Sequence, residues 1–316
     1  MLHRRHPPPF IRTPSGRKAD MSHITHAERV IDARSGITKG ELVAYFDSVA
    51  TLLLPHLRAR PVAFLRAPNG VGGPFFFQKH ADPDELPGVE QLDRALDPQH
   101  EPLLGIASRR GLLSAAQMNV VELHTWGATT RAIDRPDRIV FDLDPGSGVA
   151  WRALCEAAQA LRAFLDTLGL ASFVKTSGGK GLHVLVPLAP RQGWDAVRGF
   201  AHAVVDELAR QHPERFVAKS GEQNRVGRIF IDYLRNGFAA TTVAAWSPRG
   251  RPGLGVSVPI AWYELDEIGG SDHWTVRTAG ARLAIGDTPW ADYRHARQGL
   301  TLAMKRIGFD PKEVAA

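Results

Sequence analysis

The stretch Arg138-Ile139-Val140-Phe141-Asp142-Leu143-Asp144-Pro145-Gly146 decides the fold. Its apolar, β-branched residues predict a strand, and because side chains alternate between the faces of a strand, Asp142 and Asp144 point to the same side. Two carboxylates in one small volume repel each other unless a cation or a shared proton lies between them. Pro145 and Gly146 end the strand, which places the pair at the rim of a sheet. An Asp-rich turn that closes a strand explains this stretch alone equally well.

Composition predicts a soluble globular protein, because 44% of the 316 residues are hydrophobic and 23% are charged. This length suits one large α/β domain or two smaller ones. The formal charge of +6 is compatible with a polyanionic partner, although solubility explains mild basicity as well. Cys155 is the only cysteine, which excludes an internal disulfide and a cysteine-based zinc site and suits a reducing cytoplasm. We expect no signal peptide and no membrane span, since no run approaches about 20 apolar residues.

The amino-terminal part divides into an arm and a helix. Residues 1–22 are basic, Pro-rich and aperiodic, and predict a flexible arm before an ordered domain over residues 23–316. Thr38-Lys39-Gly40-Glu41 has the form of a capping box and predicts a helix from Lys39 to about Leu54 that stops at Pro55. The amino end of this helix, with Lys39 and Arg29, could hold an anion, but an ordinary capped surface helix is the favoured interpretation.

Two aromatic segments are candidates for ligand contact. In Phe75-Phe76-Phe77-Gln78-Lys79-His80, at least one ring should face solvent or a ligand, and rings beside a lysine and a histidine suit base stacking. A strand buried on both faces explains the same run at least as well. His124 lies two residues before Trp126, which is a modest signal because single histidines are more often structural than catalytic.

The run Ser177-Gly178-Gly179-Lys180-Gly181-Leu182-His183 resembles a phosphate-binding loop, but its spacing does not fit and it leads into a strand where a P-loop opens a helix. We expect a turn between two strands, with backbone N–H groups, Ser177 and Lys180 forming a phosphate nest. His183 then faces away from Leu182 and Val184. The alternative is a Gly-rich hairpin with one solvated histidine.

A third carboxylate, Asp232, ends the apolar run Arg228-Ile229-Phe230-Ile231. A lone aspartate at a strand end usually caps or turns the chain. Together with Asp142, Asp144 and the arginines near the strands, however, it completes a set that could hold two divalent ions for phosphoryl transfer. Carboxylate ligands favour Mg²⁺ or Mn²⁺.

These motifs resemble the polymerase domain of bacterial DNA ligase D, in the archaeo-eukaryotic primase superfamily. The resemblance rests on Val140–Gly146, Thr176–His183 and Ile229–Asp232, and weaker similarity lies at Gly36–Lys39, Phe76–His80, Glu122–Trp126 and Thr241–Ala245. These segments occur in the family's order from about Ile24 to past Trp262. The resemblance implies an α/β primase-like fold, with a central, largely antiparallel sheet region flanked by helices.

The resemblance also implies a function. The expected enzyme is a template-dependent nucleotidyl transferase that adds nucleotides, with ribonucleotides preferred, to DNA ends and gaps during double-strand-break repair by non-homologous end joining. It would use two Mn²⁺ or Mg²⁺ ions. Its partners would be nucleoside triphosphates, DNA with a 5′-phosphorylated gap or end, Ku and an ATP-dependent DNA ligase, in the cytoplasm with the nucleoid. The alternatives are a free-standing primase that starts chains without a primer and a catalytically idle DNA-end-binding module.

The resemblance assigns the roles residue by residue. Asp142 and Asp144 would hold both metals and Asp232 the catalytic one. The triphosphate would be contacted by Ser177, Lys180 and His183, helped by Arg225 and Arg249, with His124 near the sugar. Phe76 and Phe77 would stack on the templating base, and Arg29 and Lys39 would hold the 5′-phosphate. Two departures stand out: Arg29 replaces a lysine of some members, and Leu65 replaces a basic residue of some relatives.

Overall fold

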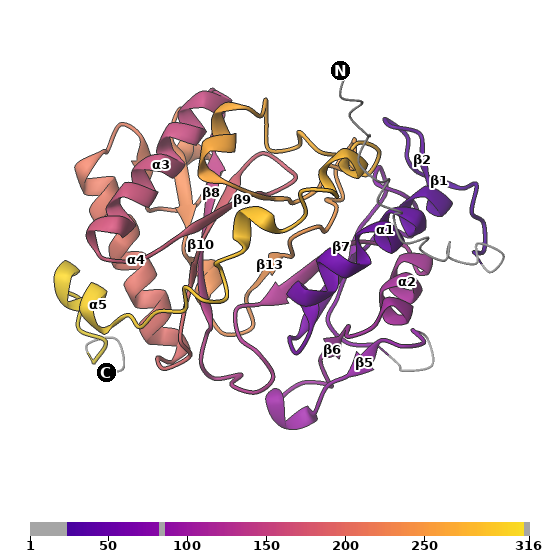
Figure 1. The fold of residues 1–316 in the computed structure, drawn as a ribbon, viewed down its shortest axis with the longest axis horizontal. Helices are drawn as coiled ribbons and strands as arrows, with labels where there is room; N and C mark the ends of the chain where they lie inside the picture. Colours follow the sequence, from indigo (N-terminus) through magenta and orange to yellow (C-terminus); the bar gives the residue numbers. More distant parts are fainter. Residues whose placement is uncertain (1–23, 82–85, 313–316) are drawn as a thin grey trace, which may run out of the picture.

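A computed structural model describes residues 24–81 and 86–312, so the predicted arm lies outside the described residues. The chain has an α/β fold built around two separate sheets (Figure 1). The larger sheet has six strands in the order β11-β12-β8-β10-β9-β14. Its strands are β8 (Arg138–Pro145), β9 (Phe173–Thr176), β10 (Leu182–Pro187), β11 (Phe216–Val217), β12 (Ile229–Asp232) and β14 (Pro259–Ile260). Neighbouring strands are antiparallel except for β11 and β12, which confirms the largely antiparallel sheet.

The second sheet has four antiparallel strands in the order β13-β7-β3-β4. They are β3 (Val62–Arg66), β4 (Phe76–Gln78), β7 (Val120–Trp126) and β13 (Thr241–Val243). Two small pairs complete the strands, β1 (Val30–Asp32) with β2 (Ile37–Thr38) and β5 (Glu90–Gln91) with β6 (Leu104–Gly105).

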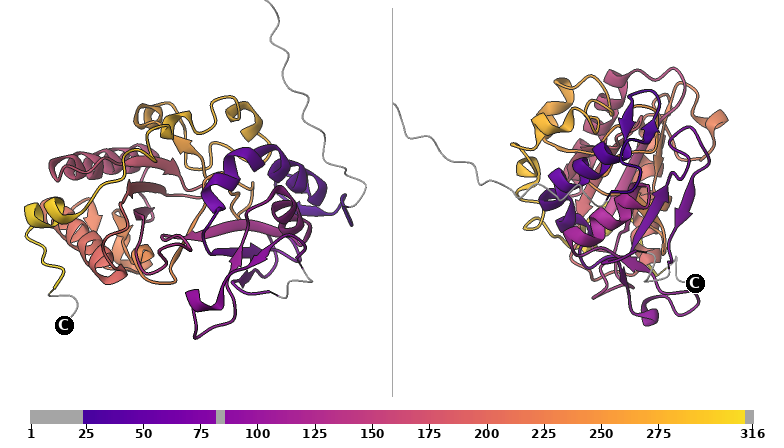
Figure 2. Two further views of the ribbon diagram at one scale, coloured as in Figure 1. Left: turned by 60° about the horizontal axis from the view of Figure 1, so that its bottom comes forward. Right: turned by 90° about the vertical axis from the view of Figure 1, so that its right-hand side faces the viewer.

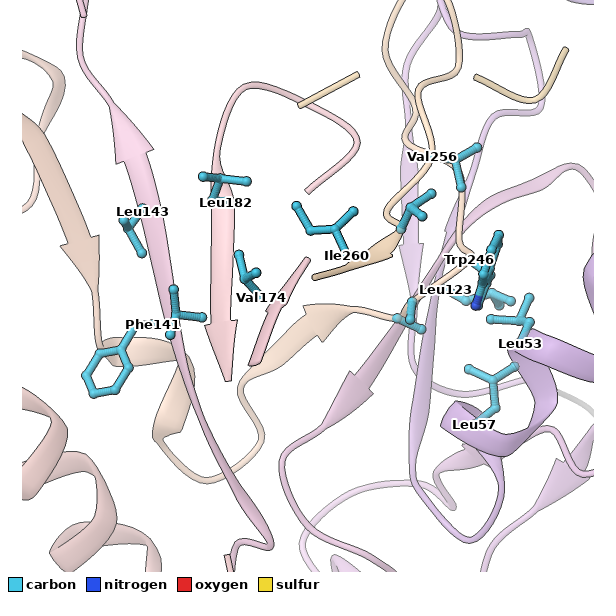
Figure 3. Close-up of a cluster of buried hydrophobic side chains, with 14 of the residues drawn as sticks. Leu53, Leu57, Leu123, Phe141, Leu143, Val174, Leu182, Trp246, Val256 and Ile260 are labelled. Carbon is cyan, nitrogen blue, oxygen red and sulfur yellow. The ribbon is translucent and has the colours of Figure 1, made fainter. Parts of the chain in front are cut away.

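The helices divide between the two sheets. As Figures 1 and 2 show, α3 (Trp151–Thr167), α4 (Trp194–Gln211) and α5 (Thr301–Ile307) lie at the end of the molecule that holds the six-stranded sheet, and α1 (Lys39–Leu57) and α2 (Arg109–Gln117) lie at the other. Buried side chains of both halves nevertheless belong to one hydrophobic cluster. Figure 3 shows part of it, from Phe141 on β8 to Leu53 and Leu57 on α1. The two sheets are thus held by one continuous core.

The predicted start of α1 is confirmed, and its predicted end is wrong. Thr38 Oγ1 accepts a hydrogen bond from the Glu41 backbone N–H at 3.2 Å, and Glu41 Oε2 accepts one from the Thr38 N–H at 2.8 Å. The helix then passes Pro55 and ends at Leu57. A proline this close to the end removes a single backbone hydrogen bond, and the fully buried Leu57 side chain offsets that loss.

None of the helices within residues 24–81 and 86–312 combines the length and the apolar character that crossing a lipid bilayer demands.

Candidate active site

The three predicted carboxylates lie on one face of the six-stranded sheet. Asp142 and Asp144 are both within β8, so the interpretation of this stretch as an Asp-rich turn is wrong. Asp232 ends β12 and pairs directly with Asp142 across the antiparallel ladder. Because paired residues of adjacent strands project to the same side, and residues two apart along a strand do so as well, all three side chains share that side.

The carboxylates repel one another strongly. Burial raises the pKa of the Asp144 carboxyl, and the negative charge of Asp142 raises it further. The pKa of Asp232 is raised by the same two causes. Burial acts on Asp142 too, but His183 and two arginines outweigh it and hold the pKa of Asp142 well below its ordinary value. The mutual repulsion of these carboxylates therefore favours cations beside them.

Two arginines supply positive charge to this face. The Arg235 Nε atom lies 3.0 Å from Asp232 Oδ2 and 3.8 Å from Asp142 Oδ2. Arg225 Nη1 donates to Asp144 Oδ2 at 3.2 Å. Arg225 was predicted, whereas Arg235 was missed; its position three residues after the carboxylate that ends β12 was the available signal.

A backbone contact places Arg225 beside β8. A Cβ atom built on Gly146 would lie 1.6 Å from the Arg225 carbonyl oxygen, so only glycine allows this approach. The Gly146 N–H also donates to the Arg228 carbonyl at 2.9 Å. The segment that precedes β12 is thereby fixed against the end of β8.

A row of polar side chains continues across the sheet. Lys175 pairs with His183, and His183 pairs with Asp142. His183 is buried, so a hairpin with a solvated histidine is excluded. Its Nε2 lies 3.4 Å from Asp142 Oδ1, and its Nδ1 has no hydrogen-bond partner among the described residues. Burial and the charge of Lys175 lower the pKa of His183 to about 4, which keeps the imidazole neutral at physiological pH.

The Gly-rich segment forms the predicted turn between β9 and β10. Gly178 adopts a φ of +70°, and a Cβ there would meet the backbone of Val256 at 2.7 Å. Ser177 Oγ accepts hydrogen bonds from the Gly179 and Gly181 N–H groups at 3.2 and 3.1 Å. Ser177 thus shapes the turn from within, while Lys180 is exposed beside it.

The carboxylates of β8, the Gly-rich turn and the arginines border one cavity of about 800 Å³. Of the predicted residues, those that line it are Asp142, Asp144, Ser177, Lys180, Arg225 and Arg249. Arg235 and Arg251 line it as well. A cavity that brings carboxylates together with cationic groups suits a metal-bound polyphosphate.

A buried carboxylate that the sequence did not single out connects two of the predicted residues. Glu122 Oε2 lies 2.6 Å from His124 Nε2 and accepts a hydrogen bond from Arg249 Nε at 3.0 Å, while Oε1 accepts one from the Gly250 N–H at 2.6 Å. Burial by itself would raise the pKa of Glu122, but these partners lower it to about 2. The spacing Glu122-x-His124 on a strand was the signal that could have found it.

The phenylalanine run faces solvent. Phe75, Phe76 and Phe77 are exposed by 41%, 53% and 44%, which rules out a strand buried on both faces. Phe77 meets His124 edge to face, with ring centroids 5.7 Å apart. Phe77 therefore borders the Glu122 network.

The pair Arg29 and Lys39 lies apart from this cavity, at the amino end of α1. Lys39 is buried, its Nζ donates to the Thr25 carbonyl at 2.8 Å, and its backbone N–H donates to the Arg29 carbonyl. Burial, followed by the charge of Arg29, lowers the pKa of Lys39. The two cations are thus neighbours, as an anion site at this helix end requires.

The chemistry of the donor set fits a divalent metal, since it consists of carboxylate oxygens whose mutual repulsion a cation would relieve. The three carboxylates do not form a preassembled metal site in this structure. Within residues 24–81 and 86–312, no three His, Cys, Asp or Glu side chains converge on a point that could hold an ion, and guanidinium groups contact the aspartates instead. Metal binding would require Arg225 and Arg235 to yield these contacts.

Comparison with known proteins places this geometry in a family. Residues 38–290 match the family model described as LigD, primase-polymerase domain. The multifunctional non-homologous end joining protein LigD of Pseudomonas aeruginosa is 51% identical over 285 residues, which are 90% of this chain and 34% of that protein. The protein of the same name from Mycolicibacterium smegmatis is 34% identical over 77% of this chain and 32% of its own length. The chain thus spans about a third of the length of these curated relatives.

A solved structure supports the same assignment. The polymerase domain from Mycobacterium tuberculosis ligase D, in complex with DNA, aligns with a TM-score of 0.75 and 30% identity, covering 83% of this chain and 94% of that one. With the family model matching most of the chain, the carboxylate-bearing sheet and its polyphosphate-sized cavity belong to a member of the LigD primase-polymerase domain family of nucleotidyltransferases.

Proposed function

We propose that this chain extends a primer 3′-hydroxyl with nucleotides on a DNA template, at gaps and ends that arise in double-strand-break repair by non-homologous end joining. One observation carries the proposal: the register that pairs Asp232 with Asp142 collects three carboxylates on the face that opens into the cavity of the Ser177–Lys180 turn. The names of the relatives, end joining proteins LigD, support the repair context.

In this proposal Asp142, Asp144 and Asp232 hold two Mn²⁺ or Mg²⁺ ions. Bound there, the ions would activate the attacking hydroxyl and stabilise the pyrophosphate leaving group. The cationic side chains of the protein would bind the triphosphate. Lys180, Arg225 and Arg249 border the cavity and would neutralise the triphosphate, and His183 would contact it.

The Glu122 network would orient the nucleotide. Glu122 fixes Arg249 through its Nε atom and leaves the terminal guanidinium nitrogens directed elsewhere; Nη1 donates to the Ser177 carbonyl at 3.1 Å. His124, held by the same carboxylate, would lie near the sugar. We infer that the preference for ribonucleotides depends on this side of the site, because a 2′-hydroxyl needs a fixed polar partner to be distinguished.

The DNA contacts are proposed from exposure and charge. Exposed rings of Phe76 and Phe77 offer a stacking surface for the templating base. Arg29 and Lys39 at the amino end of α1 would bind the 5′-phosphate of a gap. Ku and an ATP-dependent DNA ligase are proposed partners, and we propose a cytoplasmic location with the nucleoid.

Primer extension on a gapped duplex tests the central proposal. Asp142→Asn should lower extension by at least about 100-fold, because metal stabilisation of transition-state charge is worth several kcal/mol. Electrophoretic mobility shifts should show DNA binding largely kept. Asp195→Asn, an exposed aspartate on α4, is the matched control and should change neither. Extension at the normal rate in a preparation of Asp142→Asn would mean that the activity belongs to a contaminant, as the idle end-binding module predicts.

The same assay separates the finer alternatives. Reactions with and without primer distinguish a polymerase from a primase, and product formed equally well without primer would overturn the proposal. Ribonucleotides should be incorporated faster than deoxynucleotides, and Mn²⁺ should support the reaction at least as well as Mg²⁺. Equal rates with both sugars would refute the ribonucleotide preference alone.

The 5′-phosphate site has its own test. Lys39→Ala should reduce the advantage of a 5′-phosphorylated gap over a gap with a 5′-hydroxyl more than it reduces extension of an open template. Lys305→Ala on α5 controls for the loss of one positive charge. Equal losses on all substrates would show that Lys39 has no specific role at the phosphate.

A further inference from the structure

A second cavity, of about 430 Å³, lies at the opposite end of β8 from the aspartates. Arg138, the first residue of β8, lines it, and Asp142 follows four residues later, about 13 Å along the strand. Between them, Val140, Leu185 and Trp290 form a separate hydrophobic cluster on the same face of the sheet. No residue within 24–81 and 86–312 lines both cavities, so the second cavity is not an extension of the first.

The walls of this second cavity carry a large excess of positive charge. Five arginines line it: Arg58, Arg60, Arg138, Arg294 and Arg297. Among the described residues, the only two carboxylates that oppose them are those of Asp137 and Asp287. Asp137 is engaged by Arg60, whose Nη1 donates to Oδ1 at 2.8 Å, and Asp287 lies 2.9 Å from His56 Nε2 and accepts from Trp246 Nε1 at 2.6 Å. Both carboxylates are thus already paired.

The deepest of these arginines is incompletely paired. Arg138 is 9% exposed, and its buried Nε makes no hydrogen bond with any described residue; the nearest carboxylate oxygen, Asp137 Oδ1, is 3.5 Å away. The Tyr293 hydroxyl is buried beside it and also has no hydrogen-bond partner among the described residues. Buried donors of this kind are normally satisfied, so both point to an acceptor that is supplied from outside the chain.

Burial and neighbouring positive charge destabilise the charged Arg138 guanidinium, which a bound anion would stabilise. The pKa of Arg138 is lowered by burial and by the nearby charge of Arg60. A planar guanidinium in such a place binds oxyanions in a fork of two hydrogen bonds. The arginines of this cavity exceed its aspartates by three, so one further carboxylate would not neutralise the positive charge. A ligand with two or more phosphate groups carries negative charge of that size.

We propose that this cavity is a second phosphate-binding site, which takes an anion with at least two phosphate groups, with Arg138 and Tyr293 at its base and Arg294 and Arg297 at its rim. The phosphates come either from a free polyphosphate or nucleotide or from consecutive phosphates of a nucleic-acid strand. The stacked rings of Trp290 and Tyr293, 4.8 Å apart and 11° from parallel, form an apolar wall beside the anion. The proposal does not depend on the proposed polymerase activity.

The proposed phosphate site can be tested by isothermal titration calorimetry with inorganic pyrophosphate in a buffer free of divalent metal. Because the catalytic cavity and the proposed 5′-phosphate site at Arg29 and Lys39 also attract phosphate, the background variant is Lys39→Ala/Lys180→Ala/Arg249→Ala. This background should bind pyrophosphate at a stoichiometry near one. Adding Arg294→Ala and Arg297→Ala, both at exposed positions, should weaken binding at least about 10-fold, the factor expected from losing one hydrogen bond to a charged group.

Two further variants make the test specific. Adding Arg210→Ala and Arg306→Ala removes the same charge from helices that do not line the cavity, and should leave binding unchanged. Arg138→Lys keeps the charge but loses the planar fork, and should weaken binding several-fold. Absence of binding in the background variant, equal loss with the Arg210/Arg306 pair, or unchanged binding by Arg138→Lys would each overturn the proposal.

Competition identifies the source of the phosphates. If an oligothymidylate displaces pyrophosphate from the background variant and ATP does not, the natural ligand is a nucleic-acid strand. The reverse result identifies a free nucleotide. Displacement by neither, together with retained pyrophosphate binding, supports a site for inorganic polyphosphate.

Discussion

Glu122 offers the sharpest quantitative test of the site. Replacing Glu122 by glutamine keeps the shape of the side chain and an oxygen acceptor but removes the negative charge. In the wild type this charge faces Arg249 Nε at 3.0 Å and the Gly250 N–H at 2.6 Å, at a position only 4% exposed. The variant therefore leaves Arg249 without its buried counter-charge.

The size of the effect follows from the pKa of the Glu122 carboxyl. A pKa that falls from 4.5 to about 2 on folding contributes about 3 kcal/mol to the free energy of unfolding at pH 7. Because the folded pKa is the lower one, this contribution is complete above pH 4.5 and is lost as the pH falls from there toward 2. At pH 3.5 about 2 kcal/mol should remain.

Urea unfolding at pH 7 and pH 3.5 measures this difference. Glu122→Gln should be about 3 kcal/mol less stable than the wild type at pH 7, and the gap should shrink at pH 3.5. Extension by the variant should also show a higher KM for the nucleotide, since Arg249 and His124 lose their common anchor. Glu156→Gln, half-exposed on α3, is the control. A loss below about 1 kcal/mol at pH 7, or a gap that grows in acid, would refute the assignment of a buried carboxylate here.

Three further predictions concern packing and reactivity. Gly146→Ala should destabilise the protein by about 1–3 kcal/mol in urea unfolding and slow extension, because the new Cβ would displace the Arg225 backbone; a variant as stable and active as the wild type would contradict this contact. Tyr45→Phe should lower the free energy of unfolding by about 1 kcal/mol, because the buried hydroxyl donates to the Trp246 carbonyl at 2.8 Å, and an unchanged urea midpoint would argue against that hydrogen bond. Cys155 should resist iodoacetamide at pH 8 in the folded protein and react after denaturation, as followed by mass spectrometry, because it is buried in α3 and burial raises its pKa to about 12; rapid labelling of the native protein would show that the site opens.

Local patterns in the sequence predicted a large part of this protein. Side-chain alternation placed Asp142 and Asp144 together, the capping box marked the start of α1, and the glycines of residues 178–181 marked the turn between β9 and β10. Each of these features depends on residues a few positions apart, whose backbone geometry is set by their own side chains. The assignment of residues 1–22 as an arm before a single domain stays a prediction.

Contacts between distant segments required the tertiary structure. The pairing of Asp232 with Asp142 joins strands 90 positions apart, the Glu122 to Arg249 bond spans 127, and neither contact can be read from one of its two segments alone. The Glu122 to Arg249 contact and the arginine-lined cavity were missed for that reason; the cavity collects residues from α1, β8 and the segment that begins at Asp287, among others. Arg235 contacts Asp232 three positions away and was missed although this local signal was present. The sequence by itself determined which segments form strands and which side chains they present. Only the packing of the chain decided which of those side chains meet, because that outcome depends on strand register and on one continuous core.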